Sequence, residues 1–302
     1  MNMLIGKSRE PLLILHGGAG PMDPSIQGVN EATEALECAA RQVLHMGAKD
    51  LELVVRSLEQ LENNPLFNAG FGAALQADGK PRLSAALMNG ARQSFSGVIS
   101  ISDIRHPSRL AWALQDASSR VLTAPGHEKL SKKLKLSPEN LINPPRLAAW
   151  EQNRREAAFS SDTVGALVWN GQQLFAGTST GGRGFEEPGR VSDSATVAGT
   201  YATPFAAVSA TGIGEEIVDD ALAARLETRM RDGMTLEQAC QKTYDEATRM
   251  QRSYGWIACD AEGSFAVAYT TDVMSYLVIN LSGEVLASSH SLNRVVNPSQ
   301  PS

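Results

Sequence analysis

Thr163 stands at the start of an apolar, strand-like run, directly after a polar stretch, and this position suits a nucleophile. A threonine hydroxyl attacks a carbonyl poorly unless a base takes its proton, and a threonine that begins a chain can use its own α-amine. The reference pKa of an α-amine, about 7.7 to 8, leaves part of it neutral near pH 7. Cleavage before Thr163 would create that amine. Taken alone, however, the letters DTVG also fit an ordinary strand start.

Other chemistries find less support in the residue pattern. The glycine-rich stretch STGGRGFEEPGR lacks a Walker lysine and does not open a helix, which argues against a nucleotide site. The histidines form no ligand pair, so a metal centre on side chains is not expected; they are His16, His45, His106, His127 and His290.

The segments around Thr163 predict how it is held. Residues 131–162 mix prolines and charges, with one short helical pattern at RLAAWEQNRREAA, and we interpret them as a flexible connector. After Thr163 the pair Asn170-Gly171 predicts a tight hairpin. Further strands are expected at PLLILHGGAG, on both sides of the turn ADGK, at SGVISIS, at PFAAVSATG, and in closing hairpins at DAEG and LSGE.

Amphipathic patterns predict helices between these strands, near residues 30–46, 50–61, 108–119 and 215–231, with one more starting at the capping box of Thr235 and Gln238. Hairpins imply antiparallel sheets, and one-sided apolar stripes imply helices that cover one face of each sheet. The sequence therefore predicts an α+β fold: a four-layer αββα sandwich of two antiparallel sheets flanked by helices, formed by residues 1–302 as a single domain.

Composition limits the partners. The net charge of −6 over 302 residues gives no basic stripe for nucleic acid, so a small-molecule or dipeptide substrate is expected instead. The apolar run before His16 is too short for a signal or a membrane span, which favours a cytoplasmic protein. Cys38, Cys240 and Cys259 are widely spaced, and we expect buried free thiols.

Several motifs together resemble the N-terminal-nucleophile hydrolases of the plant-type L-asparaginase and isoaspartyl peptidase family, relatives of the glycosylasparaginases. They occur in the family's order and cover most of the chain outside the connector: LHGGAG at 15–20, NPLFNAGFGAAL at 64–75, DTVGALVWNG at 162–171, TSTGG at 178–182, GRVSDS at 189–194 and AVSATGIGEE at 207–216. The resemblance implies self-cleavage between Asp162 and Thr163, giving an α subunit 1–162 and a β subunit 163–302.

The resemblance also implies roles for individual residues. Thr163 would be the nucleophile, Thr180 would orient its hydroxyl, and Asn68 would support it from the other subunit. The Thr211 hydroxyl and the Gly212 N–H would form the oxyanion hole. The substrate's α-carboxylate and α-amine would be bound by Arg190, Asp193, Thr211, Gly212 and Gly214. Without the family, Arg190 and Asp193 would fit a surface contact in a loop.

No cofactor is expected for catalysis, but the resemblance implies a structural Na⁺. Backbone carbonyls rather than side chains would hold the ion, and hard oxygen donors suit it. These carbonyls belong to Leu61, Glu62, Asn64, Phe67, Ala69 and Phe71. The family further implies a homodimer of processed protomers, an (αβ)2 assembly.

The chain departs from the family pattern at Ser84, Asn89, Ser192, Ala195, Ile213, Tyr254 and Trp256. We interpret these departures as a pocket altered in shape and polarity around retained machinery. The expected activity is hydrolysis of L-asparagine and β-aspartyl dipeptides to L-aspartate through a threonine acyl-enzyme. Two alternatives stay open: a glycosylasparaginase-like amidase, and a catalytically weak relative that never cleaves itself.

Overall fold

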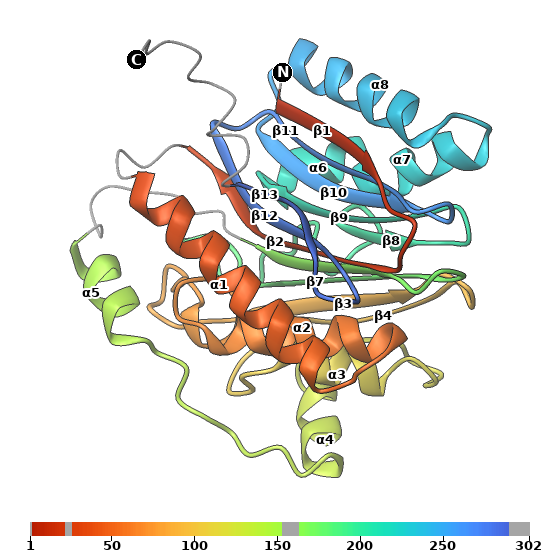
Figure 1. Cartoon of the computed structure of the whole chain (residues 1–302). Coiled ribbons are helices and arrows are strands. Elements are labelled where there is room, and N and C mark those ends of the chain that lie inside the picture. Colours follow the sequence, from red (N-terminus) through yellow and green to blue (C-terminus); the bar gives the residue numbers. More distant parts are fainter. Residues whose placement is uncertain (1, 22–25, 153–162, 290–302) are drawn as a thin grey trace.

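Two β-sheets packed face to face form the centre of the molecule (Figure 1). The computed structural model describes residues 2–21, 26–152 and 163–289. The larger sheet has the strand order β13 (Val285–Ser288), β12 (Val273–Asn280), β2 (Leu12–Gly20), β6 (Val164–Trp169), β7 (Leu174–Thr180), β3 (Leu83–Asn89), β4 (Ser94–Ile101) and β5 (Val121–Leu122). The smaller sheet has the order β1 (Asn2–Lys7), β11 (Ser264–Tyr269), β10 (Tyr254–Asp260), β9 (Ala206–Gly212) and β8 (Thr200–Ala202).

Helices cover the outer face of each sheet (Figure 1). The larger sheet carries α1 (Ile26–His45), α2 (Asp50–Asn63) and α3 (Pro107–Ala113), whereas the smaller one carries α6 (Gly214–Asp220), α7 (Leu222–Arg231) and α8 (Leu236–Arg249). Every strand pair is antiparallel except the short pairing of β4 with β5. The predicted α+β sandwich, with two sheets flanked by helices, is thus confirmed.

The apolar stripes seen in the sequence account for the layers. Leu36 and Val43 of α1 and Val54 and Leu58 of α2 are fully buried against the larger sheet. A second cluster fills the space between the two sheets, where β2 contributes Ile14 and the other sheet contributes residues of β10 and β11. Because strand side chains alternate, β2 supplies both clusters and is buried along nearly its whole length.

Several local predictions were wrong. The turn ADGK is present, with Gln76 N donating to Lys80 O at 3.0 Å, but no strand precedes it, and Ala77 instead bonds to the loop at Glu186. The helix expected at 108–119 ends at Ala113. The helix expected at 215–231 is broken into α6 and α7 at Ala221, whose φ is +46°. Cys38 is exposed, whereas the other two thiols are buried as expected.

The described part of the predicted connector contains regular structure. It begins in α4 (Gly126–Lys133) and includes α5 (Pro144–Gln152), where the sequence predicts a short helix. Trp150 of α5 stacks on Phe185 with ring centroids 5.9 Å apart, and its Nε1 donates to Gln76 O at 3.0 Å. This part of the segment therefore packs on the body of the protein; residues 153–162 lie outside the described part.

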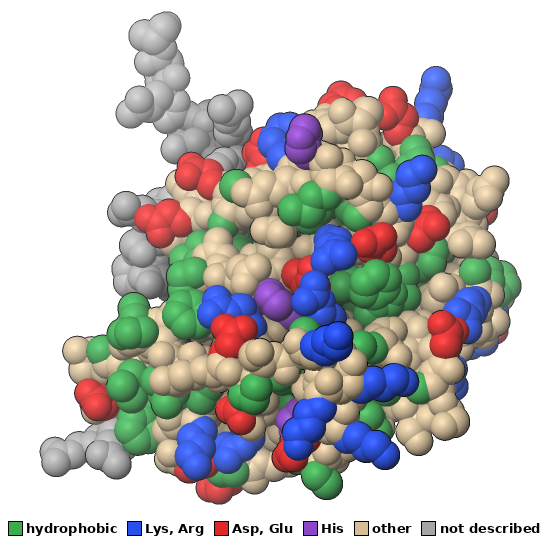
Figure 2. Space-filling model, turned by 90° about the horizontal axis from the view of Figure 1, so that it is seen from below, with side chains coloured by type: hydrophobic (Ala, Val, Ile, Leu, Met, Phe, Trp, Pro, Cys, Tyr) green, Lys and Arg blue, Asp and Glu red, His purple; other side chains and the backbone are tan. Residues whose placement is uncertain are grey.

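The surface charges and the helices bear on whether the protein could lie in a membrane. On the face drawn in Figure 2, acidic side chains lie beside several of the basic ones. Within residues 2–21, 26–152 and 163–289, no helix is long and apolar enough to cross a membrane.

Candidate active site

The hairpin of β6 and β7 brings two threonine hydroxyls together. Thr163 directly precedes β6 and Thr180 ends β7, and both side chains are buried. The Thr163 hydroxyl donates to Thr180 Oγ1 at 3.1 Å. The predicted turn at Asn170-Gly171 sets this register, because Asn170 N donates to Gln173 O at 3.1 Å and Gly171 has a φ of +95°. The sequence-predicted nucleophile and its helper are therefore neighbours.

Thr211 and Gly212 approach from the opposite sheet, at the end of β9. Thr211 points to the same side as Ser209, whose hydroxyl contacts the larger sheet. Thr211 is fully buried, and its hydroxyl has no hydrogen-bond partner within the described residues. Gly212 has a φ of +132°, and a Cβ there would lie 2.5 Å from Tyr254 Cα. A buried hydroxyl without a partner among the described residues can donate a hydrogen bond to a developing negative charge, as a donor of an oxyanion hole does.

Asn68 holds the turn that follows Thr180 rather than Thr163 itself. Its Nδ2 donates to Gly182 O at 2.7 Å, and its main-chain oxygen accepts from Gly181 N at 2.8 Å. Its Oδ1 accepts from Ala74 N at 2.7 Å. The side chain is fully buried. Among the described residues, Asn68 is thus connected to Thr163 only through the backbone beside Thr180.

Arg190 is held by two carboxylates. Its Nε and Nη2 donate to the two oxygens of Glu215 at 2.7 and 2.8 Å, and its Nη1 donates to Glu186 at 2.7 Å. The Arg190 hydrogen bonds lower the pKa of Glu215 to about 2. Glu186 is buried, whereas the Glu215 side chain is 53% exposed. Arg190 is a partly buried, oriented cation, which contradicts the alternative of a loose surface contact with Asp193.

Asp193 is a buried carboxyl without a cation in direct contact within the described residues. It is 3% exposed, and its nearest side-chain donors are the hydroxyls of Ser192 and Ser194 at 3.3 and 3.5 Å. Burial raises the pKa of Asp193 to about 7, and Arg190 opposes this rise. Gly214 provides room, because a Cβ there would lie 2.8 Å from Asp193 Oδ1. A buried acid with weak partners can receive an ammonium group.

The loop after α2 is folded around its own carbonyl oxygens. Those of Leu61, Asn64 and Ala69 each accept one backbone N–H, at 3.1, 3.3 and 3.0 Å, which leaves the second lone pair of each oxygen. Gly70 packs so closely on the Glu62 carbonyl that a Cβ would lie 2.2 Å from its oxygen. Neutral oxygen donors suit a hard monovalent cation, so these residues fit the Na⁺ site that the family resemblance implies.

Three of the departures from the family pattern line one small cavity. Ser84 pairs with Thr180 in the sheet and accepts from Ser100 N at 3.0 Å, and it lines a small polar cavity together with Thr180 and Arg190. Ser192 and Ala195 line the same cavity. Asn89 lies at the other end of β3, away from this site.

Tyr254 and Trp256 do not line the pocket, so the interpretation of a pocket reshaped by these two residues was wrong. Both are fully buried on the outer face of the smaller sheet, packed with α6, α7 and α8. The Tyr254 hydroxyl donates to Asp220 at 2.7 Å. Between them, Gly255 faces the other way, and a Cβ there would lie 2.8 Å from Met274 Sδ. Alternation along β10 therefore presents the small residue to the inside.

Some neighbours of the site were missed from the sequence. His16 is fully buried beside the Thr163 main chain, and burial lowers its pKa to about 3. Glu62 is also fully buried, and its carboxylate accepts from Ser179 Oγ at 2.7 Å and Ser108 Oγ at 2.8 Å. The sequence offered one usable signal, the i,i+4 spacing of Glu186 and Arg190; the other contacts join distant segments.

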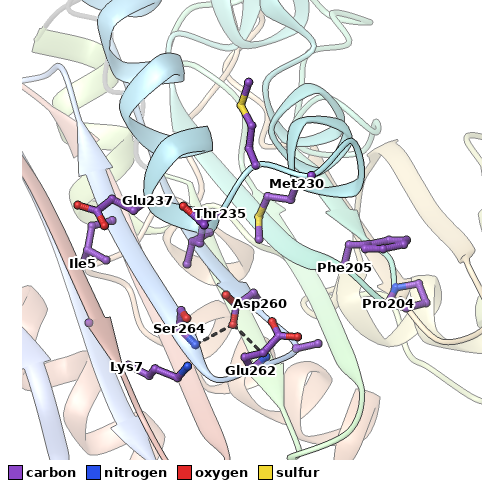
Figure 3. A pocket seen from close by; sticks show the side chains of 15 residues that line it. Ile5, Lys7, Pro204, Phe205, Met230, Thr235, Glu237, Asp260, Glu262 and Ser264 are labelled. Atoms are coloured by element: carbon purple, nitrogen blue, oxygen red, sulfur yellow. Dashed lines mark hydrogen bonds between the residues drawn. The ribbon is translucent and has the colours of Figure 1, made fainter.

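A larger groove, about 730 Å³ in volume, lies at the opposite end of the smaller sheet (Figure 3). Lys7, Phe205, Thr235 and Glu262 line it, and Asp260 accepts hydrogen bonds from the backbone at its edge. None of the residues predicted to act on a substrate borders this groove. Its size therefore says nothing about the chemistry at Thr163.

The sandwich of two sheets between helices, with a buried threonine at the start of a central hairpin strand, defines the class of N-terminal-nucleophile hydrolases. A family model described as asparaginase matches residues 9–285, and the chain belongs to that family of hydrolases. The chain is 40% identical over 284 residues to an isoaspartyl peptidase/L-asparaginase of Synechocystis sp., covering 87% of this chain and 86% of that protein.

Two further relatives cover similar shares. An isoaspartyl peptidase/L-asparaginase of Nostoc sp. is 38% identical over 287 residues, covering 88% of this chain and 90% of the relative. An isoaspartyl peptidase of Salmonella typhimurium is 30% identical over 292 residues, covering 87% and 93%.

Proposed function

We propose that this chain cleaves itself before Thr163 and then hydrolyses L-asparagine and β-aspartyl dipeptides to L-aspartate. The observation that carries this proposal is the buried Thr163 hydroxyl, 3.1 Å from Thr180 Oγ1 at the start of a strand. On the other sheet, the buried Thr211 hydroxyl has no hydrogen-bond partner among the described residues. The names of the Nostoc and Synechocystis relatives, isoaspartyl peptidase/L-asparaginase, support the substrate class.

Self-cleavage would use the nucleophile that later acts on substrate. Thr163 Oγ1 attacks the carbonyl carbon of Asp162, the C–N bond breaks, and the acyl group moves to oxygen as an ester while the nitrogen becomes a free α-amine. Water then hydrolyses the ester and releases the Asp162 carboxylate. Asp162 itself lies outside the described residues, so its role in moving the proton rests on the family resemblance.

In the catalytic cycle the new α-amine takes the proton from Thr163 Oγ1 as the oxygen attacks the side-chain carbonyl of the substrate. The Thr211 hydroxyl and the Gly212 N–H stabilise the oxyanion, and the departing ammonia or amino acid receives the proton. Water, activated by the same amine, hydrolyses the aspartyl ester. Thr180 keeps the nucleophile oriented through its 3.1 Å hydrogen bond.

The substrate's own charges would be bound by Arg190 and Asp193. The Asp193 carboxylate has no cation in contact within the described part of the chain, so it can accept the substrate ammonium. Arg190 already binds two carboxylates, and the substrate α-carboxylate would use its remaining N–H groups or displace the half-exposed Glu215.

The experiment that tests this proposal compares three substrates at equal concentration: L-asparagine, a β-aspartyl dipeptide and a glycosylated asparagine. We expect release of L-aspartate from the first two at rates well above that from the third. The reverse order would favour the glycosylasparaginase-like alternative, and no release from any of them would contradict the proposed activity.

Replacing Thr211 by valine is expected to lower kcat by about 10²- to 10³-fold with little change in KM, because one oxyanion donor is lost while the shape is kept. The variant should still fold, since the hydroxyl makes no hydrogen bond within the described residues. Steady-state kinetics on the processed protein measures both constants. A kcat within three-fold of the parent would exclude Thr211 from the oxyanion hole.

We also propose that the loop of residues 61–71 binds Na⁺ in a homodimer of processed protomers. The Na⁺ would fix the fold of the loop that leads into Asn68 and would take no part in bond cleavage. A ligand that binds only the folded protein raises the thermal midpoint. The midpoint should therefore be higher in sodium chloride than in tetramethylammonium chloride of equal ionic strength, and equal midpoints would contradict the site.

A further inference from the structure

A row of buried polar side chains crosses the space between the two sheets directly behind the candidate site. It consists of His16 on β2, Thr178 on β7, Ser209 on β9 and Thr200 on β8, and each is fully buried. The rest of this space is filled by apolar side chains such as Ile14. Polar groups in such a core are costly unless they are paired, so their contacts need a physical reason.

The contacts form one continuous chain between the sheets. His16 Nε2 lies 3.0 Å from Ser209 Oγ, and Ser209 Oγ lies 2.7 Å from Thr178 Oγ1. Thr200 Oγ1 is 2.5 Å from Thr178 Oγ1 and 2.9 Å from Ser194 O, the residue after Asp193. This chain of hydrogen bonds therefore connects the strands beside Thr163 with the loop that contains Asp193, the proposed partner of the substrate ammonium.

The row lies one side-chain repeat behind the predicted catalytic groups. Residues two apart on a strand point to the same side, about 7 Å apart. The pairs are Gly165 behind Thr163 on β6, Thr178 behind Thr180 on β7, and Ser209 behind Thr211 on β9. Thr178 and Ser209 thus lie behind the threonines of β7 and β9, whereas the glycine of β6 contributes no side chain.

Gly165 has no side chain, and this leaves the space that the row of polar side chains occupies. It pairs with His16 in one direction across the sheet and with Thr178 in the other. A Cβ at Gly165 would lie 2.1 Å from both His16 Nε2 and Ser209 Oγ. The imidazole and the hydroxyl therefore meet directly over the nucleophile's own strand.

The sheets need such a connection because the catalytic groups are divided between them. Thr163 and Thr180 are on the larger sheet, whereas Thr211 and Gly212 are on the smaller one. Apolar packing between sheets accepts small shifts, while hydrogen bonds have preferred lengths and directions. A misplacement of about 1 Å can cost about 10²-fold in rate.

We propose that His16, Ser209, Thr178 and Thr200 form a positioning layer, which aligns the Thr163–Thr180 pair of one sheet with the oxyanion donors of the other. The layer touches no substrate and acts through the strands. This inference rests on the proposed function, since it assigns a purpose to the alignment of these particular threonines.

The test uses Ser209→Ala and the nearly isosteric Thr178→Val, with Thr178→Ser as the conservative variant. We expect kcat of the processed enzyme to fall about 10- to 100-fold in the first two, with KM within about three-fold, and to recover largely in Thr178→Ser. Ser96→Ala is the matched control. Ser96 is also a fully buried strand serine with two hydrogen bonds, but it contacts Ala111 and Gln115 on the helix side of the larger sheet.

A double-mutant cycle separates alignment from general stability. If Ser209 acts by aligning Thr211, Ser209→Ala combined with Thr211→Val should be about as slow as Thr211→Val alone. If the two single losses of kcat multiply in the double variant, the proposed positioning layer is overturned. A kcat near the parent value in Thr178→Val would also overturn it, and so would an equal loss of kcat in Ser96→Ala. If Ser209→Ala does not fold, Thr178→Val decides. An intact, inactive parent protein would instead contradict the proposed function, and with it any need for alignment.

Discussion

Thr163→Ala is expected to remain a single chain and to hydrolyse neither L-asparagine nor β-aspartyl dipeptides. In the proposed mechanism, the substitution removes the oxygen that attacks Asp162 in self-cleavage and the substrate carbonyl in turnover, so both reactions should fail together. Loss of a nucleophile from a hydrolase lowers kcat by at least about 10⁴-fold. Denaturing electrophoresis and an ammonia-release assay measure the two effects on the same preparation.

Thr163→Ser provides the control, because serine keeps the hydroxyl and the α-amine but lacks the methyl group. It should cleave and turn over more slowly than the parent and far above the alanine variant. The Thr163 side chain is buried, with one hydrogen bond to Thr180 among the described residues, so alanine should not unfold the protein. Activity that persists in an intact, folded Thr163→Ala protein would exclude the mechanism.

Asp193→Asn is expected to lower kcat/KM by about 10- to 100-fold, mainly through KM, because a charge-assisted hydrogen bond to the substrate ammonium is lost. The pH dependence should change as well. The pKa of Asp193 is raised to about 7 by burial, so its protonated form predominates below that pH and binds no ammonium. In the proposed mechanism, the Thr163 α-amine must also be neutral, and the reference pKa of an α-amine is about 7.7 to 8.

The logarithm of kcat/KM should therefore rise with pH at a slope approaching two below pH 6.5 in the parent, and at a slope of one in Asp193→Asn.

The parent and Asp193→Asn should also differ in stability. Because the folded pKa of Asp193 lies above its unfolded value of 3.8, ionisation from about pH 4 to pH 7 destabilises the fold. Asp193→Asn should thus unfold at a higher temperature than the parent at pH 8, and the difference should vanish near pH 4. In the kinetic experiment, equal slopes of log kcat/KM against pH in the two proteins would exclude Asp193 as the ammonium site.

Local chemistry made much of the fold predictable. Asn170-Gly171 forms the predicted tight turn, and the Thr235 hydroxyl accepts from Gln238 N at 3.2 Å in the predicted capping box. Apolar periodicity found α1 and α2 because their buried stripes are long. Two predictions failed where tertiary contacts decide: the ADGK turn bonds to a distant loop, and Ala221 breaks a continuous helical pattern at φ +46°.

The sequence indicated candidate residues for the site but not the contacts between them. The motifs selected Thr163, Thr180 and Thr211, yet no spacing in the sequence indicates that Glu215 would bind Arg190. The side of a strand to which a residue points was equally hidden, and Tyr254 was therefore assigned to the wrong face. His16 was considered only as a metal ligand, whereas its contact with Ser209 joins residues 193 positions apart.

The intact mass of the purified protein, followed over time at neutral pH, tests self-cleavage before Thr163 most directly. The expected result is conversion of the 32.3 kDa chain into two fragments, one ending at Asp162 and the other beginning with Thr163 and carrying a free α-amine. Amidohydrolase activity should appear in proportion to the fragments. A chain that remains at full mass after prolonged incubation, or that hydrolyses L-asparagine while intact, would contradict the account.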